Sequence, residues 1–151
     1  MAKIETSTTI DRPVDEVWNF MLDVSSLPKW IPGNIEGKVT SEGPIGVGTT
    51  LRMKNSASPK MVEFRITGFE PGRKSTMEVT APQMMRGSIE TFVLENAEGK
   101  TKVNLTFDMK LHGFYTLVGP LAARSMRKGG ETEVGNLKRV LESEAESSKK
   151  T

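Results

Sequence analysis

Apolar and polar residues alternate along the first segment of the chain, residues 3–10. The alternation places four side chains on one face: Ile4, Thr6, Thr8 and Ile10. Charged and polar side chains occupy the other face. Because side chains of a strand point alternately to its two faces, this pattern predicts a strand with one buried face.

The period changes over residues 11–23, which we expect to form a helix. Pro13 suits a first helical turn, and the acidic residues Asp15 and Glu16 complement the positive end of the helix dipole. Apolar side chains then recur at the helical spacing i, i+3, i+4 and i+7, at Val14, Val17, Trp18 and Met21. A further short turn is expected from Ser25 to Trp30, before Pro32 and Gly33 redirect the chain.

A run of strands separated by turn signals is predicted between residues 35 and 112. The clearest strand is the last, in which Val103, Leu105, Phe107 and Met109 alternate with polar residues. Strands this close in sequence pair as an antiparallel meander, of about six strands here. The segments that the alternation delimits are 51–55, 61–69, 75–80, 87–95 and 101–112.

The helical period returns over residues 114–144 and predicts one long helix. Its apolar stripe comprises Val118, Ala122, Met126, Gly130, Val134, Leu137 and Leu141. Residues 1–2 and the polar segment 145–151 are expected to be frayed. The order of elements predicts a single α+β domain over residues 1–151, in which a curved antiparallel sheet of about seven strands is covered by the C-terminal helix.

Composition narrows the classes of function. The formal net charge is +2, and the 21 lysines and arginines are scattered, so we expect no nucleic-acid partner. The chain has no cysteine, which excludes disulfides and thiolate metal sites. No apolar run is long enough for an integral membrane segment, and without a targeting signal we expect a cytoplasmic location.

Several segments in this order resemble the START-like, or SRPBCC, superfamily, and within it the polyketide cyclase/dehydratase and lipid transport branch. The residues that carry the resemblance are "IDRPVDEVWNFMLDVSSLPKWIPG", "GPIGVGTTLRM", "ITGFEPGRK", "GKTKVNLTFDMKLHG" and "LKRVLESE". The resemblance implies a helix-grip fold with a hydrophobic cavity between the sheet and the long helix. It implies no single chemistry, because the superfamily includes lipid carriers, aromatase/cyclases, hormone receptors and chaperone partners.

The chain is rich in methionine, with nine residues against one tyrosine. Methionine side chains adapt their shape, so this richness favours an interior that repacks around apolar ligands. For any single residue, ordinary core packing is the alternative. The side chains that we expect to line a ligand cavity are Trp30, Met53, Phe64, Met77, Met85, Phe92, Phe107, Met109 and Met126, together with the backbone at Gly130.

Three of these residues have open alternatives: Trp30, Gly130 and Met85. Trp30, in a loop that the resemblance places at one end of the cavity, either forms a wall of the cavity or plugs the end of the sheet with its indole N–H bonded to a carbonyl. Gly130 lies on the inward stripe of the helix, where glycine is costly. It indicates close approach of the sheet, a break in the helix, or open volume below the helix. Met84 and Met85 form either an exposed lip or part of a buried hairpin.

Candidate catalytic residues are few. Glu90 shares a face with Phe92 if the strand register holds, and a carboxyl group in an apolar pocket would have a raised pKa; a slip of one residue would turn it outward. His112 is the sole histidine and ends the last strand, where solvent exposure is the alternative. The acidic residues are dispersed, so we expect neither a metal nor a cofactor.

Three functions remain. The preferred one is a non-catalytic carrier or sensor of a small hydrophobic or amphipathic ligand, of lipid or polyketide type. The first alternative is a metal-independent cyclase or dehydratase that uses Glu90 or His112 to move protons. The second is a protein-interaction module that uses the pair Met84 and Met85. Neither the identity of the ligand nor the oligomeric state follows from the sequence.

Overall fold

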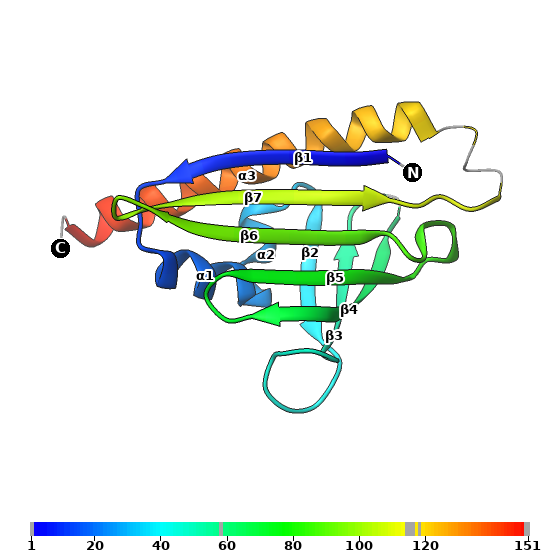
Figure 1. Cartoon of the computed structure of the whole chain (residues 1–151), viewed down its shortest axis with the longest axis horizontal. Helices are drawn as coiled ribbons and strands as arrows, with labels where there is room; N and C mark the ends of the chain where they lie inside the picture. The colour runs from blue at the N-terminus through cyan, green and yellow to red at the C-terminus, as the bar shows by residue number, and fades with distance from the viewer. Residues whose placement is uncertain (1, 58, 114–116, 118, 150–151) are drawn as a thin grey trace.

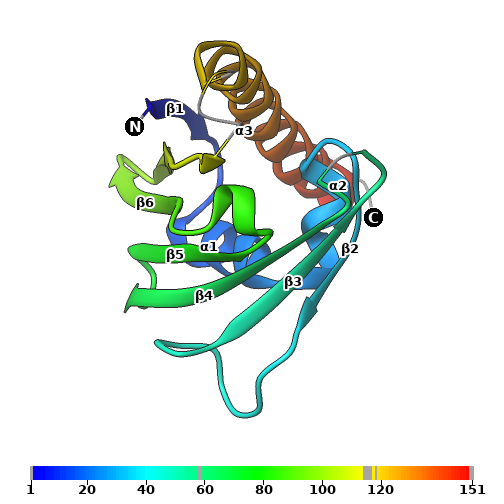
Figure 2. The same cartoon turned by 90° about the vertical axis from the view of Figure 1, so that its right-hand side faces the viewer.

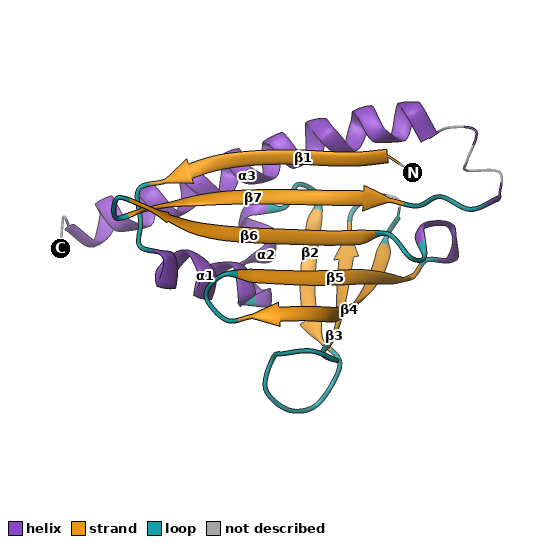
Figure 3. Ribbon diagram, in the orientation of Figure 1, coloured by secondary structure: helices purple, strands orange, loops and turns teal. Residues whose placement is uncertain are grey.

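Seven antiparallel strands form one sheet in the computed structural model, which describes residues 2–57, 59–113, 117 and 119–149 (Figures 1 and 3). The strand order is β1-β7-β6-β5-β4-β3-β2. The strands are β1 (Ala2–Ile10), β2 (Asn34–Val39), β3 (Thr50–Asn55), β4 (Met61–Glu70), β5 (Lys74–Ala81), β6 (Ile89–Ala97) and β7 (Lys100–Met109). The α+β class and the antiparallel meander predicted from the sequence are confirmed.

Helices follow the first strand and the last strand of the sheet. Between β1 and β2 the chain forms α1 (Val14–Leu22), the 3₁₀ turn η1 (Val24–Ser26) and α2 (Leu27–Trp30). A second 3₁₀ turn, η2 (Gln83–Met85), connects β5 to β6, and α3 (Gly119–Lys149) ends the chain. The predicted helix and short turn are both present, and α1 buries Val17, Trp18 and Met21 as its apolar spacing indicates.

Strand β2 is the element that the sequence did not delimit. Its side chains alternate poorly in polarity, and its pairing with β3 shifts register between Asn34 and Glu36. Gly37 explains the shape of this edge. A Cβ atom there would lie 2.5 Å from Leu27 Cδ1 and 2.9 Å from the carbonyl oxygen of Val24, so only glycine lets β2 pass so close to η1 and α2.

The helices close the two edges of the sheet. α3 packs along β1, α2 packs against β2, and α2 and α3 contact each other. Figure 2 shows the sheet curling from β1 round to β2, with α3 lying across the open side. A hydrogen bond from Asn136 Nδ2 to the carbonyl oxygen of Trp30 (3.2 Å) ties the two helices together. This arrangement is the helix-grip fold.

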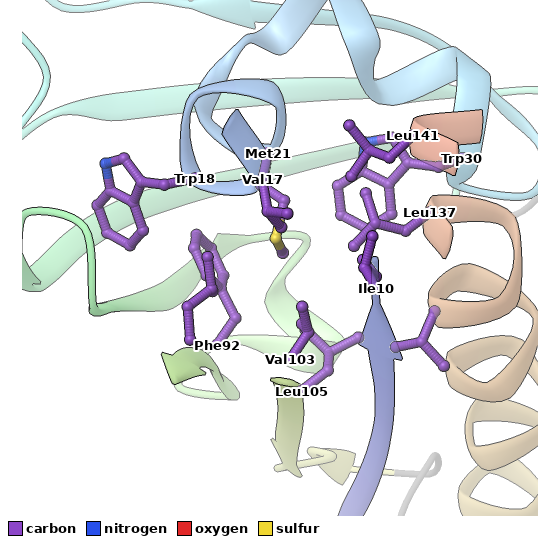
Figure 4. Packing of buried hydrophobic residues seen from close by; sticks show 12 residues of the cluster. Ile10, Val17, Trp18, Met21, Trp30, Phe92, Val103, Leu105, Leu137 and Leu141 are labelled. Carbon is purple, nitrogen blue, oxygen red and sulfur yellow. The ribbon is translucent and has the colours of Figure 1, made fainter. Parts of the chain in front are cut away.

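The two halves of α3 cover different interiors. Toward the C-terminus, Val134, Leu137 and Leu141 are buried against a continuous apolar core that includes Ile10 and Trp30 (Figure 4). Toward the N-terminus, the inward side chains are only half-buried, as at Met126. The helix therefore grips a packed core at one end of the sheet and covers a hollow at the other.

Gly130 lies where α3 approaches β1 closely. A Cβ atom there would lie 3.2 Å from both Cγ2 and Oγ1 of Thr6, whereas one at Gly129 would meet nothing within 4 Å. α3 runs through both glycines without interruption, so the predicted alternative of a helix break is wrong. Close approach of the sheet is what Gly130 permits.

The ends of the predicted helix differ from expectation or lie outside the described residues. α3 continues to Lys149, into the segment expected to be frayed. Residues 1 and 150–151 and the predicted stripe residue Val118 are outside the part of the chain that the structure describes. Among the described residues, no helix combines the length and the apolar character needed to cross a membrane.

Candidate functional site

A cavity of about 280 Å³ lies between the N-terminal half of α3 and the inner face of the sheet. Its walls are mainly apolar. β1, β3, β4 and β7 contribute Ile4, Met53, Phe64 and Phe107, η2 contributes Met85, and α3 contributes Met126. The backbone of Gly130 also borders the cavity. These walls come from strands at both sides of the sheet and from α3. The cavity therefore forms only because the sheet curls and brings these elements round one space.

A second, smaller pocket of about 50 Å³ lies next to this cavity. The two share four lining residues: Ile31, Met53, Phe64 and Glu90. The smaller pocket reaches toward the packed end of the sheet, where Trp30, Met77 and Phe92 line it. We call the larger one the main cavity and the smaller one the inner pocket.

The residues predicted from the sequence divide between these two spaces. Met85, Phe107, Met126 and Gly130 line the main cavity, Trp30, Met77 and Phe92 line the inner pocket, and Met53 and Phe64 line both. Met109 is different: it is buried but lies among the linings of neither space. Met109 lies two residues after Phe107 on the same face of β7, at the end of the strand. The expectation that it lines the cavity is wrong.

Trp30 belongs mainly to the packed end of the molecule. Its side chain is 4% exposed and lies beside Leu137 and Leu141 (Figure 4). Its indole N–H donates to the hydroxyl of Ser26 at 3.4 Å, rather than to a carbonyl. Because Trp30 also borders the inner pocket, the two alternatives considered for it coincide: it fills the core and forms a wall.

Glu90 faces inward, which resolves the register that the sequence left open. Strand pairing places it in one row across the sheet, with Phe107 and then Ile4 on one side and Met77 and then Ile66 on the other. Every neighbour in this row is apolar. Burial among them raises the pKa of the Glu90 carboxyl from its usual range to about 7.

Glu133 brings a second carboxyl into the same cavity from α3. Burial, and to a smaller extent the neighbouring charge of Glu90, raises the pKa of this carboxyl to about 8. Two carboxyl groups this close oppose each other's ionisation, so the pair retains at least one proton near neutral pH. Neither carboxyl has a hydrogen-bond or ion-pair partner within the described ranges.

The pair gives the main cavity a distinct chemistry. Among the described residues that line it, Glu90 and Glu133 are the only ones with ionisable side chains, and no lysine or arginine offsets them. A protonated carboxyl donates a hydrogen bond to a carbonyl or hydroxyl group, and an ionised one accepts a proton or pairs with a cation. Two carboxyls with raised pKa values thus suit either polar recognition or acid–base chemistry.

Glu133 was not among the candidates drawn from the sequence. The signal was nevertheless present: it follows Met126 by seven residues and precedes Leu137 by four, which places it on the inward stripe of the helix. Apolar residues alone defined that stripe, so a half-buried acid on it was overlooked.

His112 lines neither the main cavity nor the inner pocket, so the structure does not bring this candidate catalytic residue together with Glu90. Its Nε2 donates to the carbonyl oxygen of Arg86 at 2.7 Å, and its backbone N–H donates to the carbonyl oxygen of Met84 at 3.0 Å. β7 ends at Met109, so His112 lies after the strand, and these bonds tie the segment that follows β7 to the η2 turn. Met84 is half-buried in that turn, as is Met85, so the pair is not an exposed lip.

No group of three or more histidine, cysteine, aspartate or glutamate side chains gathers as a metal site in the described parts of the chain. The main cavity contributes two carboxylates and the inner pocket shares one of them. The site therefore offers hydrogen bonding, proton transfer and apolar contact.

Comparison with known proteins supports the fold and the family. The structure resembles that of the di-domain ARO/CYC BexL from the BE-7585A biosynthetic pathway, with a TM-score of 0.76 and 18% identity over 94% of this chain and 47% of that one. The chain thus spans about half the length of that relative. No protein of curated function matches the sequence.

Two single-domain structures align over nearly their whole length. TTHA0849 from Thermus thermophilus has a TM-score of 0.74 and 18% identity, with 91% of this chain and 94% of that chain covered. The Zhui aromatase/cyclase from Streptomyces sp. R1128 has a TM-score of 0.72 and 16% identity, with 93% of each chain covered. At these identities the likeness establishes the fold alone. The family model for polyketide cyclase / dehydrase and lipid transport matches residues 1–142, and the chain belongs to this START-like family.

Proposed function

We propose that the protein binds a small hydrophobic or amphipathic ligand, of lipid or polyketide type, in the main cavity. The observation that carries this proposal is a hollow of about 280 Å³ with methionine and phenylalanine walls. Such a volume suits a small organic molecule, and flexible methionine side chains adapt to its shape. Membership of a family named for polyketide cyclisation and lipid transport supports the same reading.

The carboxyl pair of Glu90 and Glu133 restricts the charge of the ligands that we expect to bind. A fatty-acid carboxylate would place a third acidic group beside Glu90 and Glu133, and no lysine or arginine is among the described residues that line the main cavity to offset it. A ligand with a carbonyl, hydroxyl or amine group finds a donor or acceptor in the pair. We therefore expect neutral or basic amphipathic ligands to be preferred over anionic ones.

The second candidate is an acid–base enzyme of the cyclase or dehydratase type. The presence of two carboxyls with raised pKa values in one apolar cavity favours it, because one can act as acid while the other acts as base. The mass and the chromatographic retention time of a ligand recovered after incubation separate the two candidates. Both are unchanged for a carrier, the mass is lower by one water for a dehydratase, and the retention time changes at constant mass for a cyclase that releases no water.

Filling the main cavity should weaken ligand binding. In the Met126→Trp variant the larger ring occupies space that a ligand needs, and we expect the affinity for the neutral probe N-phenyl-1-naphthylamine to fall about tenfold or more. Leu121→Trp is the matched control, because Leu121 lies on the same helix and is 72% exposed. Fluorescence titration measures both. Equal binding by the two variants would exclude the main cavity as the binding site.

A further inference from the structure

The inner pocket contains a buried hydroxyl group with no partner. Ser75 is 1% exposed, and its Oγ has no hydrogen-bond partner within the part of the chain that the structure describes. Leaving a buried hydroxyl unpaired costs free energy, so buried polar atoms in proteins are nearly always paired. Asn34 Oδ1 is also unpaired, but Asn34 lines neither space.

Sheet pairing places Ser75 next to the carboxyl shared by both spaces. Ser75 is opposite Phe92 on β6, and Met77 is opposite Glu90. Ser75 and Glu90 are therefore diagonal neighbours on the inner face, a relation that separates residues by about 7–8 Å in sheets generally. One molecule can contact both groups at that separation.

The walls of the inner pocket continue those of the main cavity. Ile31, Met53 and Phe64 border both, so the two spaces adjoin at these side chains. The inner pocket, at about 50 Å³, admits only a small group. Lys38 and Arg52 are also among its lining residues.

We propose that Ser75 determines specificity by hydrogen-bonding a hydroxyl or carbonyl group at the leading end of an elongated ligand whose apolar body fills the main cavity. This inference rests on the proposed function and adds the shape and polarity of the ligand. The serine hydroxyl both donates and accepts, so it suits either group. A ligand with an apolar leading end would give the Ser75 hydroxyl no hydrogen bond, so we expect it to bind more weakly than a ligand with a hydroxyl or carbonyl group there.

Two probes that differ in one hydroxyl group test this assignment: biphenyl and 4-phenylphenol, both titrated by displacement of N-phenyl-1-naphthylamine. We expect wild type to prefer 4-phenylphenol by about 3–10-fold, the range of one net hydrogen bond. Ser75→Ala should abolish that preference and leave biphenyl binding intact. Thr80→Ala, at an exposed position on the same strand, should retain it. Because Ser75→Ala removes an unpaired buried hydroxyl, it should unfold at a temperature no lower than wild type.

The outcomes separate the two proposals. If wild type binds both probes and Ser75→Ala keeps the hydroxyl preference, the role of Ser75 is wrong and ligand binding in the cavity stands. The same holds if wild type binds the two probes equally. If neither probe binds wild type, the proposed function fails and the role of Ser75 fails with it.

Discussion

Replacing both Glu90 and Glu133 by glutamine should stabilise the protein at about pH 9 and leave its stability nearly unchanged at about pH 5. The unfolded chain has glutamate pKa values near 4.5, whereas the folded pKa values are about 7 and about 8. The folded state therefore holds protons that the unfolded state has already released. Wild-type stability falls as the pH rises from the unfolded value through the folded values, and is level above them.

The expected size of this effect follows from the difference between the folded and unfolded pKa values. A tenfold change in the acid dissociation constant of one group corresponds to about 1.4 kcal/mol of stability. Because both carboxyls are only half-buried, solvent screens part of this cost, and we expect the loss in wild type to be on the order of 3 kcal/mol rather than the full sum. The double variant has neither carboxyl group, so its stability should not show this loss as the pH rises.

Urea unfolding at the two pH values measures the difference between variant and wild type. Glu131→Gln is the control, because Glu131 is exposed on the same helix and should show no pH-dependent gain. If the difference in unfolding free energy between the double variant and wild type were the same at both pH values, the carboxyls would be solvated in the folded protein and the prediction would be wrong.

Other acidic groups with shifted pKa values do not confuse this comparison. Hydrogen bonds from the Ser25 side chain and backbone lower the pKa of Asp23, and a hydrogen bond from Lys138 lowers that of Glu142. Both groups are ionised throughout the chosen range. Their contribution to stability is lost only at lower pH.

The Trp30→Ala variant should lose about 3–5 kcal/mol of unfolding free energy, because it leaves a large hole in a packed core. Trp30 contacts the C-terminal half of α3 and donates a hydrogen bond to Ser26, so its removal loosens the grip of the helix as well as the core. Trp30→Phe, which keeps part of the ring, should lose less.

Chemical denaturation of both variants measures these losses. Val47→Ala is a suitable control, since Val47 is 70% exposed in the loop between β2 and β3, and it should change stability by less than about 0.5 kcal/mol. A loss below about 1 kcal/mol for Trp30→Ala would contradict a core role for this residue.

Strict alternation made the inner face of β7 predictable, because only one register buries Val103, Leu105 and Phe107 together. The face of Glu90 was less certain. On β6 the apolar residues Phe92 and Leu94 point inward, and Glu90 shares their face. An acidic side chain is not expected on a buried face unless that face borders a cavity. Polarity alone cannot assign an acidic residue whose environment is made by other strands.

The curl of the sheet was not predictable from local pattern. Whether α3 rests on packed side chains or on a hollow depends on how far β2 and β3 turn toward β1, and that turn involves the shifted register at Asn34 and the missing side chain at Gly37. The apolar residues that define the stripe continue through both halves of α3, so they gave no sign that Leu137 meets a core while Met126 meets a cavity. Glu133 was overlooked for the same reason.

Methyl NMR of methionine tests the central claim most directly, because the nine methionines of the chain sample both the cavity and its surroundings. With N-phenyl-1-naphthylamine added, the resonances of Met53, Met85 and Met126 should shift, since all three line the main cavity. Those of Met109, buried elsewhere, and of Met61, which is 42% exposed, should not. Shifts confined to Met61 or Met109, with the three cavity methionines unchanged, would contradict a ligand site between the sheet and α3.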